Sequence, residues 1–495
     1  MTVRYRTGAL PGDVKWKTIN WSKAWRHVRR LQMRIAKAVS VGRYRKAKAL
    51  QWILTHSHHA KVLAVKRVTS NKGKKTPGID GVLWKGNKTK MQAALSLKQH
   101  GYKPLPLRRI YIPKKNGKLR PLSIPTMFDR AMQALYKLAL APVAETTADN
   151  NSYGFREGRS CADAIQAAFN ALSKPNSATY ILEADIEGCF DNIEKAWMLR
   201  NIPMEKAILR KWLEAGYIEN NLKYPTLKGT PQGGIISPML ANMALDGLEQ
   251  VVKQAAAKRN RINFVRYADD FIVTGKSEKI LEQKVRPAIE KFLVDRGLRL
   301  SEAKTSTTHI SDGFTFLGQT FRKQGNILHI TPSKEGIQAL ITKVGNLIRS
   351  HVRAPMEALI RKLNPILRGW ANYHRHVVSA RAFSRVDTYV FKQLWRMVLR
   401  RHQDKPKGWL IKNYWSAAGK HIFSITHKAN NKSYILKAIR ISSIGIKRHI
   451  KIKADANPYM PEYAGYFWRR RHIKEARQLG ALSSRAYRAQ IAQEV

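Results

Sequence analysis

Hydrophobic residues near the start of the chain recur every three or four positions, which is the spacing of one face of an α-helix. Between residues 20 and 70 most arginines and lysines fall outside this stripe, so the pattern predicts amphipathic helix with a basic outer face. Residues 70–86, rich in Lys, Gly and Asn, predict a loop. The apolar stripe consists of Trp21, Trp25, Val28, Leu31, Ile35 and Val39.

The middle of the chain mixes strand and helix periods. Short apolar runs at residues 109–113 and 119–124 flank Asn116-Gly117, a strong signal for a β-hairpin. Strands and helices follow without regular alternation, so the predicted fold class is α+β. Helices are predicted at 127–145, 238–258 and 278–295, and strands at 180–186, at 264–275 as two short strands, and at 313–321.

After residue 333 the helical period continues through three amphipathic stretches, which predict a small helical bundle. Beyond about residue 430 the chain is short, strongly basic and interrupted by prolines. The three apolar stripes are Ile337, Leu340, Ile341, Val344, Leu347 and Ile348; Leu359, Leu363, Ile366, Leu367 and Trp370; and Phe383, Val386, Val390, Leu394 and Met397.

Charge adds a partner to this picture. The 495 residues carry 91 Lys and Arg against 33 Asp and Glu, a net charge of +58, while 44% are hydrophobic. A disordered basic tail has low hydrophobicity, so we expect a folded protein that binds a polyanion. Residues 1–120 hold 31 basic against 2 acidic side chains, residues 121–340 hold 28 against 24, and residues 341–495 hold 32 against 7. This distribution predicts a catalytic block between two nucleic-acid-binding arms.

Cysteine and hydropathy patterns indicate the compartment. Cys161 and Cys189 are the only cysteines, which excludes a multi-disulfide framework and a cysteine zinc module. The sequence has no uncharged apolar run of about 18 residues and no secretory hydrophobic segment at its start. We therefore expect a reduced, cytoplasmic protein that is neither secreted nor bound to a membrane.

Three carboxylates of the middle block are the sharpest chemical feature. Asp185 ends the apolar strand YILEAD, and Asp269 and Asp270 lie inside FVRYADDFIV, where a hairpin would hold both at one sheet edge. Adjacent carboxylates repel one another, and Mg²⁺ compensates oxygen ligands well. Two such ions would clamp the attacking and leaving oxygens of a phosphoryl transfer. On these residues alone, ordinary turn chemistry and a strand-end cap remain the alternative.

Seven segments in order along residues 105–321 resemble the blocks of a reverse transcriptase of the group II intron type. They are IYIPKKNGKLRPLSIPT, NSYGFREGRS, ILEADIEGCFDNI, GTPQGGIISPMLANMALD, FVRYADDFIV, GLRLSEAKT and FTFLGQTF. The segment LNPILRGWANYHR at residues 363–375 is similar to the thumb, or maturase-specific, segment that follows the polymerase in intron-encoded proteins. The resemblance implies a right-hand polymerase of fingers, palm and thumb.

The resemblance also implies roles for particular residues. Asp185 and Asp269 would bind two Mg²⁺ ions. Asp270 is the third carboxylate, and Ile186 belongs to the same metal site. Phe190 would be the bulky gate that excludes a ribose 2′-hydroxyl, with a place in the core as its alternative role. Nucleotide-binding roles fall to Lys114 and Arg120 at the triphosphate, Gln232 against the incoming nucleotide, and Lys304 as proton donor to pyrophosphate, while Gly233 and Gly234 admit the duplex backbone.

Basic residues at both ends are the predicted contacts to nucleic acid. The implied partners are intron RNA in a ribonucleoprotein, an RNA template with a DNA primer, target DNA and deoxynucleoside triphosphates. For the C-terminal arginines, a solvated run of charge is the alternative. The predicted contacts are Arg26, Arg29, Arg30, Arg34, Lys37, Arg368, Arg469, Arg470 and Arg471.

Five regions follow from these observations. Many of the intron-encoded proteins that this chain resembles end in an HNH-type endonuclease with two cysteine pairs. No cysteine follows Cys189 here, so we expect this endonuclease to be absent and the primer to come from another source. The regions are a basic helical extension at 1–75, fingers at 76–180, palm at 181–335, thumb at 336–430 and a short basic DNA-binding segment at 431–495, with the reverse transcriptase domain at about 95–335.

The predicted function is RNA-directed DNA synthesis together with binding, splicing and mobility of a group II intron RNA by target-primed reverse transcription. One alternative is a maturase that binds RNA without polymerising, and the intact set Asp185, Asp269, Asp270, Gln232 and Phe190 argues against it. The other is a reverse transcriptase with another role, such as defence, and the thumb segment argues against that.

Overall fold

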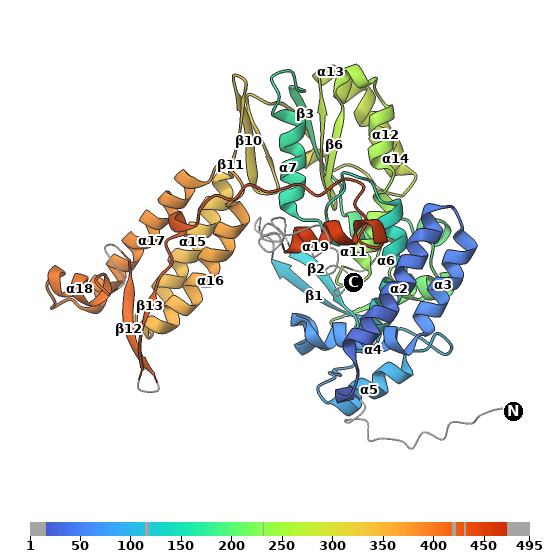
Figure 1. Cartoon of the computed structure of the whole chain (residues 1–495), viewed down its shortest axis with the longest axis horizontal. Helices are drawn as coiled ribbons and strands as arrows, with labels where there is room; N and C mark the ends of the chain where they lie inside the picture. The colour runs from blue at the N-terminus through green and yellow to red at the C-terminus, as the bar shows by residue number, and fades with distance from the viewer. Residues whose placement is uncertain are drawn as a thin grey trace, which may run out of the picture.

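The computed structural model describes residues 16–113, 117, 119–230, 232–417, 422–429 and 432–472. Figure 1 shows N-terminal helices beside a central body, a helical thumb on the opposite side, and a C-terminal segment that runs back from the thumb to the body. This is the predicted α+β class with the layout of a right hand. No helix within these ranges is both long and apolar enough to cross a bilayer.

Three helices occupy the helical run predicted at residues 20–70. Helix α2 (Trp21–Ser40) is capped at its N-terminus by Asn20, whose side chain accepts a hydrogen bond from the Lys23 amide at 2.9 Å. Most of its predicted apolar face is buried, but Trp25 is 50% exposed and lies outside the core. The other N-terminal helices are α3 (Tyr44–His56), α4 (His58–Ser70), η1 (Lys72–Lys75) and α5 (Asn87–Ser96), and both α2 and α4 pack on α6 (Met127–Thr147).

The predicted hairpin forms the edge of the fingers sheet, where β1 (Leu107–Pro113) pairs antiparallel with β2 (Leu119–Ile124). Strand β4 (Tyr217–Glu219) joins β1 in parallel and β5 (Leu222–Tyr224) follows it, in the order β2-β1-β4-β5. These two short strands belong to the fingers, although the predicted boundary at residue 180 assigned them to the palm. Strands of three residues carry too little period to be recognised in the sequence.

The palm is a four-stranded antiparallel sheet in the order β6-β7-β3-β8. The two central strands, β3 and β7, are mostly buried, which explains their nearly continuous apolar runs. The strands are β3 (Tyr180–Asp185), β6 (Asn263–Tyr267), β7 (Asp270–Gly275) and β8 (Ser306–His309). The helices of this region are α7 (Cys161–Leu172), α8 (Cys189–Asn192), α9 (Lys195–Asn201), α10 (Lys206–Glu214), α11 (Ser237–Leu245), α12 (Leu248–Gln254), η2 (Lys258–Asn260), α13 (Glu278–Ile280), η3 (Leu281–Val285), α14 (Arg286–Val294) and η4 (Glu302–Lys304).

Two predicted elements are interrupted. The helix predicted at 238–258 breaks between α11 and α12 at Gly247, whose φ of +98° is a conformation that favours glycine. The strand predicted at 313–321 turns back at Leu317 and Gly318, which both have positive φ. A three-stranded sheet results, made of β9 (Phe314–Phe316), β10 (Gln319–Gln324) and β11 (Ile327–Pro332).

The three predicted thumb helices are present and bury their apolar stripes in one core. A further helix, a two-stranded hairpin and Ile441 complete this core, so the predicted boundary at residue 430 falls between two paired strands inside it. The thumb elements are α15 (Lys334–Ser350), α16 (Met356–His374), α17 (Ala380–Arg401), α18 (Lys407–Tyr414), β12 (Ser424–Ala429), β13 (Lys432–Lys437) and η5 (Ile441–Ser443).

The chain then returns to the body, ending its described part with η6 (Pro461–Tyr463) and α19 (Ala464–Arg471). The anchor of this segment is Asp163, at the start of α7. Its Oδ1 accepts hydrogen bonds from the Ile452 amide at 2.7 Å and from Arg470 Nη2 at 2.6 Å. Burial raises the pKa of Asp163, but its hydrogen bonds and the Arg470 charge outweigh burial and lower the pKa to about 2.

Candidate active site

The hairpin of β6 and β7 brings the predicted carboxylates together. The strands meet in a two-residue turn of Ala268 and Asp269, and Asp185 at the end of β3 lies opposite Asp270. Ala268 has a φ of +61°, which side chains rarely adopt. Gly154 packs so close to this turn that a Cβ on it would lie 2.4 Å from the Ala268 nitrogen. Sheet register and this contact hold the three carboxylates at one edge.

A buried arginine that the sequence did not mark supports the turn. The Arg266 side chain is fully buried, and its Nη2 donates a hydrogen bond to Asp246 Oδ1 at 2.7 Å. Its Nη1 donates to the Asn242 side chain at 3.2 Å and to the Ala268 carbonyl at 3.4 Å. The guanidinium therefore ties the turn of Ala268 and Asp269 to helix α11. A lone arginine between the apolar residues of FVRYADD was the available signal.

The carboxylates repel one another. Burial raises the pKa of Asp270 from 3.8 to about 7, with further contributions from the charges of Asp185 and Asp269. Burial and the Asp185 charge also raise the pKa of Asp269. Lys304 Nζ donates a hydrogen bond to Asp185 Oδ2, and this bond raises the pKa of the lysine. The edge of the sheet is thus a place where positive charge is stabilised.

The donor set fits a hard divalent cation, because it consists of carboxylate oxygens under mutual repulsion. The Asp185 carboxylate is paired with Lys304 in this arrangement. Among the described residues, no group of three or more His, Cys, Asp or Glu side chains is arranged so that it could hold a metal ion. The Ile186 side chain is a buried hydrocarbon without donor atoms, so this residue could offer a metal only its backbone carbonyl. The two-metal site stays a prediction.

Polar side chains join the fingers hairpin to the palm. Arg120 Nε donates a hydrogen bond to Gln232 Oε1 at 2.8 Å, and Gln232 Nε2 donates to Asp191 Oδ2 at 2.5 Å. The structure thus brings together two of the predicted nucleotide-binding residues and adds Asp191, which lies in the quoted block ILEADIEGCFDNI but was given no role. Lys114 lies outside the described residues.

Phe190 is half-buried on the short helix α8. Its ring meets that of Phe155 edge to face, with 6.4 Å between centroids and 79° between planes. The Phe190 carbonyl accepts a hydrogen bond from the Thr230 amide at 2.7 Å. The residue therefore packs against the core on one side and is open on the other. This position is compatible both with a gate that excludes a ribose 2′-hydroxyl and with a place in the core. Phe155, 55% exposed, is a neighbour that the sequence did not mark.

Arg29 and Arg470, two of the predicted nucleic-acid contacts, bind residues that are far away in the sequence. Arg29 donates a hydrogen bond to the Pro458 carbonyl, and its guanidinium lies 4.7 Å from the centre of the Tyr459 ring. Arg470 is bound to Asp163. The other predicted contacts are exposed, namely Arg26, Arg30, Arg34, Lys37, Arg368, Arg469 and Arg471.

The class of protein follows from this architecture, since a palm sheet with three carboxylates at one edge, faced by a hairpin of the fingers and followed by a helical thumb, defines a right-hand nucleic acid polymerase. Residues 112–321 match the family model of reverse transcriptase (RNA-dependent DNA polymerase). Residues 16–97 match the N-terminal domain of reverse transcriptase, and residues 337–415 match the group II intron, maturase-specific domain. The chain belongs to the reverse transcriptases of the group II intron-encoded family, as its motifs predicted.

Curated relatives agree with this assignment. The chain is 33% identical over 299 residues to protein YkfC of Escherichia coli (strain K12), covering 51% of this chain and 77% of that protein. It is 32% identical over 331 residues to the group II intron-encoded protein LtrA of Lactococcus lactis subsp. cremoris, covering 52% of this chain and 54% of LtrA. The chain thus spans about half the length of LtrA. A solved telomerase chain from Candida albicans overlays with a TM-score of 0.36 at 12% identity, over 63% of this chain and 64% of that one, which is too distant to support an inference.

Proposed function

We propose that this protein is a Mg²⁺-dependent RNA-directed DNA polymerase that also binds a group II intron RNA, assists its splicing and copies it into DNA. The observation that carries the proposal is the register that places Asp185 opposite Asp270 with Asp269 in the adjoining turn. The maturase-specific domain at residues 337–415 supports the part of the proposal that concerns intron RNA.

The palm carboxylates would bind the catalytic metal. Asp185, Asp269 and Asp270 would hold two Mg²⁺ ions, which supply Lewis acidity at the primer 3′-hydroxyl and at the triphosphate. Metal binding requires Asp269 and Asp270 to be ionised, although burial and mutual repulsion favour their protonation in the metal-free protein. Metal binding is therefore linked to proton release from this edge of the sheet.

Neighbouring side chains would bind and select the nucleotide. The Arg120 guanidinium, oriented through its Nε bond to Gln232, keeps its two terminal amino groups for triphosphate oxygens. Phe190 would occupy the space that a ribose 2′-hydroxyl needs. The Lys304 ammonium, exchanging its bond with Asp185 for one to the leaving pyrophosphate, would donate a proton from Nζ.

The cationic ends would bind the nucleic acids. Exposed basic residues on α2 and α16 are suited to phosphates of the intron RNA and of a template and primer duplex, which are recognised by shape and backbone. Target DNA would be bound as well, and the expected location is the cytoplasm. A maturase without polymerase activity, or a reverse transcriptase with another role, would use the same surface, so the active site is the part to test.

Primer extension on an RNA template with Mg²⁺ and deoxynucleotides tests the polymerase. Asp269→Ala should abolish extension and leave RNA affinity unchanged, because Asp269 belongs to the palm edge and is not one of the predicted nucleic-acid contacts. The control is Asp295→Ala, an exposed carboxylate of the same domain, which should retain full extension. Extension by Asp269→Ala at the wild-type rate would refute the site, and absence of extension by the wild-type protein would favour the splicing-only alternative.

A further inference from the structure

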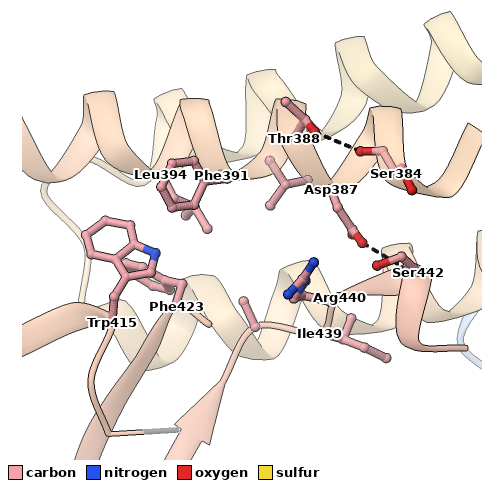
Figure 2. A pocket seen from close by; sticks show the side chains of 12 residues that line it. Ser384, Asp387, Thr388, Phe391, Leu394, Trp415, Phe423, Ile439, Arg440 and Ser442 are labelled. Carbon is pink, nitrogen blue, oxygen red and sulfur yellow. Dashed lines mark hydrogen bonds between the residues drawn. The ribbon is translucent and has the colours of Figure 1, made fainter. Parts of the chain in front are cut away.

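The thumb holds a cavity of about 290 Å³ between helix α17 and the segment that follows β13. Pockets for drug-sized ligands measure about 300–1,000 Å³, so this one has room for a single small ring system. Phe391, Trp415 and Phe423 contribute aromatic walls, and Asp387 and Arg440 contribute polar groups (Figure 2). The cavity lies in the thumb, separate from the palm edge that carries the carboxylates.

Trp415 gives the cavity a buried donor. Its side chain is only 4% exposed, yet its indole Nε1 has no hydrogen-bond partner within the described part of the chain. Figure 2 shows the nitrogen edge of the indole turned toward the cavity. An indole nitrogen can only donate, and a buried donor without an acceptor is unfavourable. The cavity therefore favours an occupant that brings an acceptor to this point.

Asp387 and Arg440 also line the cavity, and their charges determine which part of an occupant can lie beside them. Each Asp387 oxygen accepts a hydrogen bond at 2.9 Å, one from the Ile441 amide and one from the Ser442 amide. Arg440 is exposed and offers donors and a positive charge. The occupant is thus met by one donor, Trp415 Nε1, at one end and by the Arg440 cation at the other, and the lining also includes the Asp387 carboxylate.

The surroundings of the cavity favour a polyanion. Residues 380–440 contain 14 Lys and Arg against two carboxylates, Asp387 and Asp404. Phe391 is 37% exposed and presents an aromatic surface beside these cations. Aromatic surfaces interleaved with basic side chains bind unpaired bases by stacking and the adjoining phosphates by charge.

We propose that this cavity captures one unstacked base of the bound RNA. The base ring would lie between the aromatic walls and accept a hydrogen bond from Trp415 Nε1, and its phosphate would lie toward Arg440. With the phosphate toward Arg440, the edge of the base that meets Trp415 is the one farthest from the sugar. Guanine and uracil carry a carbonyl oxygen at that edge, whereas adenine and cytosine carry an amino group, so guanine and uracil fit this site better. The inference rests on the proposed binding of RNA by this protein and adds a base-specific contact to it.

Fluorescence anisotropy with short labelled RNA hairpins tests the site in the full-length protein. Each hairpin carries one bulged nucleotide, either uridine, guanosine, adenosine, cytidine or an abasic residue, and the salt concentration is held constant because phosphate contacts depend on it. The wild-type protein should bind the uridine or guanosine bulge about tenfold more tightly than the abasic one. Trp415→Phe, which keeps the ring and removes the donor, should lose the preference for uridine and guanosine over adenosine and cytidine.

Trp409→Phe is the matched control, because this tryptophan lies on α18 outside the cavity and should keep the wild-type preferences. Equal affinity of the wild-type protein for bulged and abasic hairpins would overturn the inference, and so would an unchanged base preference in Trp415→Phe. Primer extension by the same preparations reports on the proposed polymerase separately. A protein that extends primers but ignores the bulged base would refute the cavity assignment alone.

Discussion

Asp270 lowers the stability of the metal-free protein at neutral pH, so Asp270→Asn should stabilise it. Burial and the charges of Asp185 and Asp269 raise its pKa from 3.8 to about 7. A carboxyl whose pKa is raised on folding favours the protonated state, so stability is lost as the pH rises from about 3.8 through about 7. This difference of about three pH units, at about 1.4 kcal/mol each, corresponds to about 4 kcal/mol at pH 8 as an upper bound. Asparagine keeps the shape and removes the charge, and we expect a gain of about 2–4 kcal/mol.

Hydrogen exchange of the β7 amides in metal-free protein measures this gain in the palm itself, because exchange reports the free energy of local opening. The gain from Asp270→Asn should be largest at pH 8 and fall below about 1 kcal/mol at pH 4, where the native carboxyl carries its proton. Added Mg²⁺ should stabilise the wild-type protein more than the variant, because the variant lacks one of the proposed ligands.

Asp404→Asn is the control for this experiment, since Asp404 is an exposed carboxylate of the thumb and its substitution should change stability by less than about 0.5 kcal/mol. A neutral or destabilising effect of Asp270→Asn at pH 8 would refute the claim that the ionised Asp270 carboxylate destabilises the metal-free protein. An equal gain at pH 8 and pH 4 would refute it as well, because repulsion between ionised carboxylates cannot act when one of them is protonated.

Two further substitutions test the surroundings of the site. Arg266→Met leaves Asp246 buried without its partner and should lower the free energy of unfolding by about 3–5 kcal/mol in urea titrations, whereas Arg299→Met at a surface ion pair should cost at most about 1 kcal/mol. Equal effects of the two would contradict the supporting role of Arg266. Phe190→Ala should lower the ratio of kcat/KM for a deoxynucleotide over its ribonucleotide at least about tenfold, and an unchanged ratio would exclude the gate.

Features with a strong local period could be predicted from the sequence. The thumb helices carry a stripe every three or four residues, and their apolar faces form one core as expected. The strand YILEAD and the second half of FVRYADDFIV are apolar over most of their length because they form β3 and β7, the two central strands of the palm sheet. Asp185, Asp269 and Asp270 could also be predicted to lie at one edge of the sheet, because the end of a strand and a tight turn can both be recognised from a few neighbouring residues.

Contacts between distant segments could not be predicted in this way. Strands β4 and β5 join the fingers hairpin about a hundred residues away, and nothing in three residues of sequence specifies that partner. Arg266 stands alone among apolar residues, but the sequence does not name its partners, which are seen only where Asp246 and the Ala268 carbonyl accept its hydrogen bonds. The role of such residues is seen only from the contacts that they make in the folded protein.

The charge distribution shows the same limit, because the two basic arms are also in contact with each other. Arg29 of the N-terminal arm bonds to Pro458 and packs on Tyr459 of the C-terminal arm, and the Tyr459 hydroxyl donates a hydrogen bond to Glu157 at 2.8 Å. Asp163 binds Arg470 in the same way. Some carboxylates of the middle block therefore hold the arms in place and take no part in metal binding. Because Asp163 holds Arg470, one of the predicted nucleic-acid contacts, a change at Asp163 should alter nucleic-acid binding although Asp163 itself is not one of those contacts.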